Sequence, residues 1–147
     1  MLHGIPPEEA RGPPDIAAPL AEFSTYCAGD ILVGHFLGID LGFLRVALAR
    51  AGLPPLANAA LDTWPLYVWL SSRSPGDGAP GIPAVLDPRL PALAAALGVP
   101  CHGQHHVLRD AFVTAQVFQR LLRRRERWGV ATTAELLQNS TAAIASQ

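Results

Sequence analysis

The sequence contains no lysine, only two cysteines and little net charge. All eleven basic residues are arginines, and twelve acidic residues bring the formal net charge to −1. Net charge therefore gives no general attraction to nucleic acid or to an anionic membrane. Cys27 and Cys101 lack the spacing of a paired motif, so we expect small buried thiols in a reducing compartment, not a disulfide framework.

Long apolar runs and a leader pattern are also absent. No apolar stretch reaches the roughly 18 residues of a membrane span. The first residues, MLHGIPPEEARGPP, lack a basic region followed by an apolar one. We therefore expect a cytoplasmic protein without membrane contact. With 147 residues, 50% of them hydrophobic and 16% charged, the chain is long and apolar enough for one globular domain.

The patterns that are present alternate between strand and helix, which predicts an α/β fold. Ile31–Val33 lies between two glycines and is typical of a strand buried in a parallel sheet, and ALDTWPLYVWL (60–70) contains a second strand. Apolar periodicity predicts helices at 16–27, 41–51, 87–97 and 107–128. Two strands are a poor base for so many helices, which suggests that further strands are missing.

Several details of these helices are predicted by local signals. Asp87 is expected as the N-cap of the helix at 87–97, with Pro88 at its first position. Thr132 and Glu135 form a capping box for a short last helix. The helix at 41–51 is apolar nearly all round, so we expect it to be largely buried. Residues 1–137 are assigned to the domain and 138–147 to a flexible tail.

Two aspartates stand in first turns of predicted helices. Asp110 shares a helix side with Thr114, Val117 and Leu121, where an unpaired carboxylate would cost several kcal/mol or be protonated. Asp40 follows the first strand, at the edge where open α/β sheets place their sites. Both could also simply stabilise the start of a helix. Alternatively, they could face each other across one cleft.

Two segments carry a specific resemblance. VGHFLGIDLGFL (33–44) resembles the second motif of the DnaQ-like, DEDDh-type 3′–5′ exonucleases of the RNase H-like superfamily, and HHVLRDAFVTAQVF (105–118) resembles their third motif. LHGI and LDT also match the family in the expected order, so the resemblance covers roughly residues 2–137. The positions in register are His35, Asp40, Phe43, Leu44, His105, Leu108, Asp110, Ala111, Thr114, Ala115 and Phe118.

The resemblance implies a partial RNase H-like fold and metal-dependent removal of nucleotides from the 3′ end of single-stranded DNA or RNA. The complete family site holds two Mg²⁺ or Mn²⁺ ions about 3.5–4 Å apart. Carried over, Asp40 and Asp110 would be metal ligands, and His105 would be the general base that takes a proton from the attacking water. A polymerase or another domain is a further partner that the resemblance suggests.

The family's first motif, D-x-E-T-T-G, has no counterpart in this chain. That motif supplies two more metal-binding carboxylates, and in the family HGI lies well inside the domain, so the first strands and half the site would precede Met1. Two divalent ions 4 Å apart repel by about 4 kcal/mol even in water, which two carboxylates cannot convincingly offset. We therefore expect at most one weakly bound ion and no appreciable nuclease activity from this chain alone. Alternatively, it is a non-catalytic, degenerate exonuclease-like module that binds nucleic acid or a protein partner.

Other residues support two interpretations each. Phe36 replaces the asparagine of the family motif and could stack on a base or pack in the core. Asp62 of LDT is expected to set the strand and not to bind metal. The CHGQHH segment suggests zinc, with ligands too crowded for a closed tetrahedral site. Five arginines near a helix end could contact phosphates or simply complement the helix dipole: Arg120, Arg123, Arg124, Arg125 and Arg127. The missing strands predict an exposed sheet edge, apolar helix faces and self-association.

Overall fold

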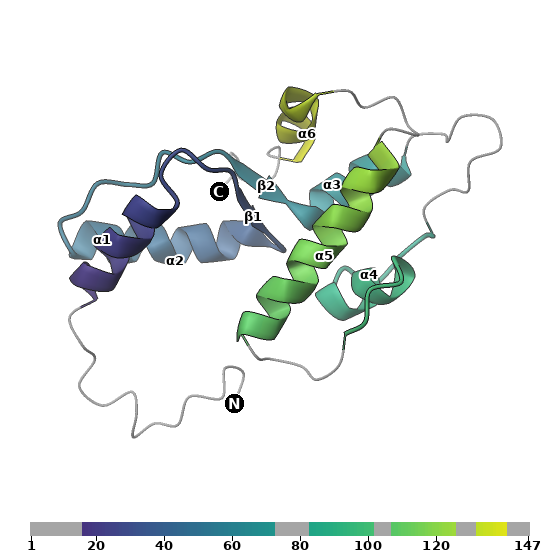
Figure 1. Ribbon diagram of the computed structural model, residues 1–147, viewed down its shortest axis with the longest axis horizontal. Helices are drawn as coiled ribbons and strands as arrows, with labels where there is room; N and C mark the ends of the chain where they lie inside the picture. The colour runs from purple at the N-terminus through teal and green to yellow at the C-terminus, as the bar shows by residue number, and fades with distance from the viewer. Residues whose placement is uncertain (1–15, 73–82, 102–106, 126–131, 141–147) are drawn as a thin grey trace, which may run out of the picture.

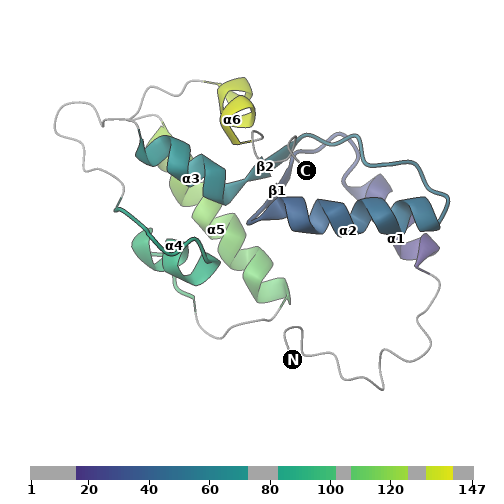
Figure 2. The same ribbon diagram turned by 180° about the vertical axis from the view of Figure 1, so that it is seen from behind.

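A computed structural model describes residues 16–72, 83–101, 107–125 and 132–140, and it confirms a helix-rich α/β fold with two parallel strands. Two helices lie at one end of the short sheet and four at the other, as Figure 1 and the reverse view in Figure 2 both show. The elements are α1 (Ala17–Tyr26), β1 (Leu32–Gly34), α2 (Leu37–Arg50), β2 (Ala60–Asp62), α3 (Thr63–Ser71), α4 (Leu90–Ala96), α5 (Val107–Arg125) and α6 (Thr133–Ser140).

The two strands are parallel and connected through α2. Leu32 lies opposite Ala60, and Gly34 lies opposite Asp62. A parallel pair needs a crossover connection, which α2 provides here. Because the strands are parallel, their carboxyl ends meet at one edge, and the segments that follow Gly34 and Asp62 come together there.

The main hydrophobic core lies on the side of the sheet where α3, α4, α5 and α6 pack. In α5 the buried residues Val113, Val117 and Leu121 recur every fourth position, which forms one apolar stripe along the helix. This core fixes α5 against α3, α4 and β1. Its buried members are Leu61, Leu66, Tyr67, Leu70, Leu93, Ala94, Leu97, Val99, Val113, Val117, Leu121 and Leu136.

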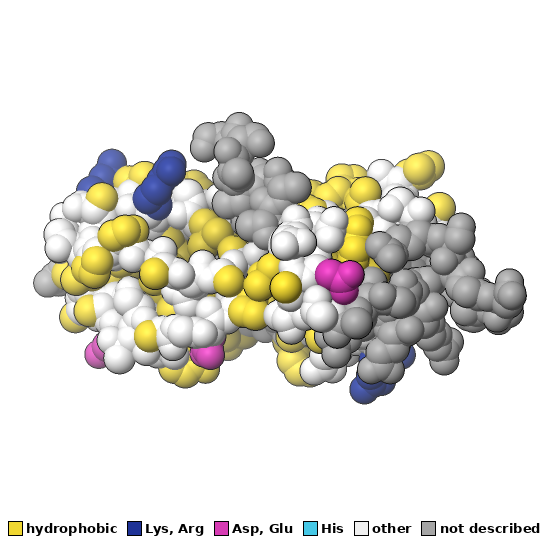
Figure 3. Space-filling model, turned by 90° about the horizontal axis from the view of Figure 1, so that it is seen from above, with side chains coloured by type: hydrophobic (Ala, Val, Ile, Leu, Met, Phe, Trp, Pro, Cys, Tyr) yellow, Lys and Arg dark blue, Asp and Glu magenta, His cyan; other side chains and the backbone are white. Residues whose placement is uncertain are grey.

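The expectation that the helix after β1 is largely buried is wrong. In α2 only Leu37 and Leu48 are buried, whereas Ile39, Phe43 and Val46 are 63%, 74% and 46% exposed. The reason is that no element in the described part of the chain covers this side of α2. Figure 3 shows hydrophobic side chains spread widely over the face seen from above, with few charged groups among them.

Three element boundaries also differ from the sequence predictions. The helix α2 begins at Leu37, so Asp40 is not its N-cap. The strand β2 stops at Asp62 because α3 follows at once and takes Pro65 into its first turn. Arg89, not Asp87, is the N-cap of α4. The capping box is confirmed, since the Glu135 and Thr132 side chains accept each other's backbone N–H. No helix within the described ranges is long and apolar enough to span a membrane.

Candidate functional site

Asp62, at the carboxyl end of β2, joins the starts of two helices. Its side chain is buried, and Oδ1 accepts hydrogen bonds from the backbone N–H of Phe36 (3.1 Å) and Trp64 (3.0 Å). Oδ2 accepts from the backbone N–H of Leu37 at 2.8 Å. These N–H groups have no partner within their own helices, so one carboxylate satisfies donors at both starts. The Asp62 carboxylate therefore fixes α2 relative to α3, a wider role than setting a strand.

Phe36 leads into α2 with an unusual backbone conformation. Its φ is 56° and its ψ is 38°, in the left-handed region. Asparagine is several-fold enriched there among non-glycine residues, which agrees with the asparagine of the motif that this segment resembles. The bonds from Phe36 and Leu37 to Asp62 hold the backbone in this shape. The ring of Phe36 lies 4.6 Å from the ring of His35, so the two aromatic groups form one wall of the site.

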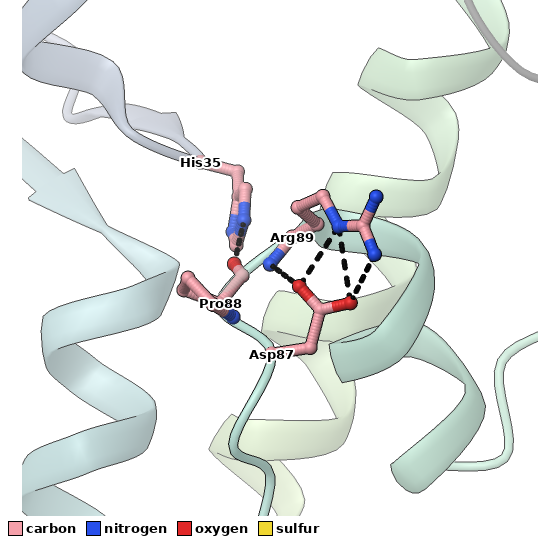
Figure 4. A network of polar contacts seen from close by, with 4 residues as sticks. All are labelled: His35, Asp87, Pro88 and Arg89. Carbon is pink, nitrogen blue, oxygen red and sulfur yellow. Dashed lines mark hydrogen bonds and ion pairs between the residues drawn. The ribbon is translucent and has the colours of Figure 1, made fainter.

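His35 links the end of β1 to two other segments, and Figure 4 shows one of these links, the contact with Pro88. Its Nε2 lies 2.8 Å from the carbonyl oxygen of Pro88, which can only accept, so Nε2 carries the proton. Its Nδ1 then accepts from the Thr63 hydroxyl at 2.9 Å. Burial lowers the pKa of His35, and the Pro88 carbonyl and the Asp62 charge oppose this only in part. The imidazole is thus a neutral connector between β1, α3 and the segment before α4.

A hollow of about 350 Å³ opens where these segments approach α5. His35 and Phe36 line it from one side, the stretch from Asp87 to Ala92 from another, and Cys101 and Asp110 from the third. Asp110 is half-buried and is the fourth residue of α5. The structure therefore brings the predicted metal ligand Asp110 and the predicted base-stacking residue Phe36 to one cavity.

Asp40 does not line this hollow. It is the fourth residue of α2, and its side chain is exposed. The pKa of Asp40 is raised, mainly by partial desolvation, with the negative charge of Asp62 adding to the shift and its own backbone N–H opposing it. Asp40 is near enough to Asp62 for that negative charge to act on it, but the structure does not bring Asp40 into the hollow that Asp110 lines.

The donor set at this edge consists of carboxylate oxygens, the ligands that Mg²⁺ and Mn²⁺ prefer. Within the described ranges, no three His, Cys, Asp or Glu side chains gather into a metal-binding group. Of the two predicted metal ligands, the described residues place Asp110 at the hollow and Asp40 outside its lining, so they offer a hard cation one of these two carboxylates there. His105, His102 and His106 lie outside the described residues, and with them the predicted general base and most of the zinc alternative.

Sequence reasoning missed two features of the site. Asp62 followed by Thr63 and Pro65 is a helix-start signal, because an aspartate often caps a helix and a proline fits its first turn. This signal could have located α3. No sequence pattern indicated that Arg89 lines the hollow, because the bend of the chain before α4 brings it there. Of the arginine cluster, Arg120 and Arg123 are exposed on α5. The other three side chains lie outside the described residues.

Comparisons with known proteins bear on this site. The model of the RNase_T family, described as "Exonuclease", matches residues 1–118. A protein of Mycobacterium tuberculosis (strain CDC 1551 / Oshkosh) named as a bifunctional exonuclease/endonuclease is 34% identical over 144 residues, which are 91% of this chain and 21% of that protein.

PolC-type DNA polymerases III are also similar. The enzyme of Streptococcus suis is 37% identical over 62 residues, 42% of this chain and 4% of the polymerase. That of Oceanobacillus iheyensis is 28% identical over 123 residues, 84% of this chain and 8% of the polymerase. The chain therefore spans about a fifth of the mycobacterial protein and a far smaller part of the polymerases.

Proposed function

Because this chain belongs to the RNase_T exonuclease family, we propose that its site serves metal-dependent hydrolysis of phosphodiester bonds at the 3′ end of single-stranded DNA or RNA. The observation that carries this proposal is the position of Asp110. It lines a hollow at the carboxyl ends of the two parallel strands, beside His35 and Phe36. In α/β sheets this edge is where ligands bind.

Each residue then has a distinct task. Asp40 and Asp110 would hold Mg²⁺ or Mn²⁺, and the bound ion would supply activation of a water and stabilisation of the leaving 3′ oxygen. His105 accepts the proton of the attacking water. Phe36 is 36% exposed and lines the hollow, so its ring could stack on a base at the 3′ end. His35 keeps the walls of the hollow in register through its bonds to Thr63 and Pro88.

We further propose that the chain by itself binds at most one ion weakly and does not degrade nucleic acid appreciably. Two carboxylates offset too little of the repulsion between two divalent ions. The similarity to PolC-type polymerases suggests that a polymerase domain accompanies such a site. A non-catalytic module that binds nucleic acid or a protein is the alternative, favoured by the absence of a three-ligand group among the described residues.

Metal binding tests the assignment of the two aspartates. Titration with Mn²⁺, followed by electron paramagnetic resonance of the free ion, should show one weak site in the unsubstituted protein. Asp110→Asn and Asp40→Asn should each remove it. Asp30→Asn, in the turn before β1, is the matched control and should leave it unchanged. Full Mn²⁺ binding by Asp110→Asn would contradict the assignment.

Incubation with 5′-labelled single-stranded DNA and Mn²⁺ tests activity. We expect no 3′ shortening by the purified chain. Clear shortening that Asp110→Ala abolishes would show that this chain is an active nuclease by itself. It would contradict the proposed inactivity while supporting the site. Binding of the same DNA without any metal requirement, unaffected by Asp110→Asn, would favour the non-catalytic module.

A further inference from the structure

Arg89 is the arginine that the described residues contribute to the lining of the hollow. It lies there with Asp110, His35 and Phe36. The other titratable oxygen and nitrogen groups in this lining are the side chains of Asp87, Asp110 and His35, and burial lowers the pKa of His35. Among the described residues that line the hollow, Arg89 is therefore the cationic side chain that a polyanionic strand would meet beside the acidic ones.

The guanidinium of Arg89 is held along one edge only. Its Nε lies 2.9 and 3.0 Å from the two oxygens of Asp87, and Nη2 lies 2.6 Å from Oδ2. Among the described residues Nη1 donates to no acceptor, and Figure 4 shows this nitrogen directed away from Asp87. The edge formed by Nη1 and Nη2 therefore keeps N–H donors in the fork geometry that matches two phosphate oxygens.

Hydrogen bonds hold the backbone of residues 83–89, the segment that leads into α4. The Tyr67 hydroxyl donates to the Pro83 carbonyl at 2.8 Å and accepts from the Val85 N–H at 2.7 Å. His35 then binds the Pro88 carbonyl. The Asp87 side chain also accepts from the Arg89 N–H at 3.0 Å. These bonds fix the backbone at Arg89, whose 80% exposed side chain is oriented by Asp87.

The pair of Asp87 and Arg89 has little to contribute to folding. An ion pair at the surface is screened by water and adds little stability. Arg89 holds the pKa of Asp87 at about 2, so the carboxylate stays ionised and keeps its grip over the working range of pH. An oriented guanidinium that adds little to the stability of the fold is better explained by a ligand.

We propose that Arg89 is a substrate-contacting residue, whose Nη1–Nη2 edge binds the non-bridging oxygens of a phosphodiester in the nucleic-acid strand while Asp87 orients the guanidinium from its other edge. This inference rests on the proposed function, since it assumes a nucleic-acid strand in the hollow. It adds the residue that positions the strand through its backbone, independently of base identity.

Salt-dependent binding tests the inference on the chain as it exists. Fluorescence anisotropy would measure the affinity for a labelled single-stranded oligothymidine in EDTA, over a series of salt concentrations, so that neither metal nor cleavage enters. Loss of one phosphate contact should reduce the slope of log affinity against log salt by about 0.7. We expect this for Arg89→Gln, with affinity about threefold to tenfold lower at low salt. Arg89→Lys should keep the slope and lose part of the affinity, because an ammonium lacks the fork.

The matched control is Arg50→Gln, in the last turn of α2, which removes the same charge away from the hollow. It should leave slope and affinity nearly unchanged, and all three variants should unfold at the same temperature. If Arg89→Gln and Arg50→Gln have equal effects, or Arg89→Gln has none, the inference is overturned and the proposed function stands. If the unsubstituted chain binds no oligonucleotide, the substrate class of the proposed function is overturned, and the inference with it.

Discussion

Among single residues, Asp62 is central to the structure of the site, because its carboxylate accepts hydrogen bonds from three backbone N–H groups. Asp62→Ala leaves these donors without an acceptor, at about 1–3 kcal/mol for each one that stays buried. Water reaches some of them after the change, so we expect a loss of about 2–4 kcal/mol in the free energy of unfolding. Urea denaturation measures it.

Two further variants make the Asp62 result specific. Asp30→Ala removes an exposed aspartate at the other end of the sheet and should change the free energy of unfolding by less than about 0.5 kcal/mol. Asp62→Asn keeps one acceptor oxygen and should fall between the two. Equal stability of the Asp62→Ala and Asp30→Ala proteins would show that the hydrogen bonds of Asp62 to α2 and α3 do not contribute to the free energy of unfolding.

His35 should make stability depend on pH in a defined direction. Its folded pKa lies below the ordinary value of 6.5, because burial disfavours the charged ring. Between the two values the unfolded chain binds more protons, so stability falls as pH drops below 6.5 through the folded pKa. Asp40 changes stability in a more acidic range and with the opposite sign, because its pKa is raised from 3.8.

The measurement is thermal unfolding of the unsubstituted protein and of His35→Gln between about pH 7.5 and 5. Their difference in stability should be largest at the upper end and shrink with acidification, because glutamine does not titrate. The histidines outside the described residues cancel in this comparison. A difference that stays constant over the range would mean that His35 titrates normally.

At the scale of elements, the approach of α2 to β1 requires a glycine at position 34. A Cβ atom there would lie 2.7 Å from Cδ1 and 2.9 Å from Cβ of Leu37. The second atom cannot move without the backbone, so Gly34→Ala should lower the free energy of unfolding by about 1–3 kcal/mol. Circular dichroism during urea unfolding measures this loss.

Gly38 and Gly42 provide the matched comparison within α2. A Cβ atom at either position would meet nothing within 4 Å. Replacing a helical glycine by alanine removes backbone freedom from the unfolded chain, so each change should raise stability by up to about 1 kcal/mol. Destabilisation by Gly38→Ala as large as that by Gly34→Ala would show that the contact with Leu37 is not the cause.

The elements that sequence could predict are those with strong local patterns. The spacing of Thr114, Val117 and Leu121 predicts a buried side of α5, and the run at 31–33 between glycines predicts β1 within a residue. Motif spacing also singled out Asp110, which the structure places at the hollow. The missing strands predict exposed apolar helix faces, but apolar periodicity does not say which helix lacks a covering element, so the exposure of Phe43 in particular was not predicted.

Other parts of the site depend on contacts between distant segments. Asp62 binds the backbone N–H groups of Phe36 and Leu37, which precede it by 26 and 25 positions in the sequence. No local pattern predicts these two hydrogen bonds. The same holds for the bond of His35 to Pro88, across 53 positions. Sequence patterns therefore single out residues such as Asp110. The hydrogen-bond partners of Asp62 and His35 follow only from the three-dimensional fold.

For the whole molecule, the exposed apolar side chains form two sets that predict self-association. Ile39 and Phe43 stand one turn apart on α2, and Leu108 and Phe112 stand one turn apart on α5. Apolar side chains gathered on a surface favour association with other surfaces of the same kind. We expect the double change Phe43→Ser with Phe112→Ser to shift the protein toward the monomer.

Light scattering over a concentration series measures this shift, and circular dichroism checks that the helices remain. Val68→Ser with Leu86→Ser, which removes two other exposed hydrophobic residues, is the control and should leave association largely unchanged. A protein that is monomeric at all concentrations before any substitution would contradict the prediction.

The uneven distribution of the core has one further consequence, for motion. The helices α1 and α2 contribute few buried side chains, whereas α3 to α6 enclose most of the core. Local opening should therefore begin at α2, and amide hydrogen exchange there should be faster than in α5. Because the first amides of α2 bind the same carboxylate as α3, each opening also releases the wall of the hollow that Phe36 forms. A molecule seated in the hollow would slow exchange in the loosest part of the chain, so occupancy could be detected there without any change at the core.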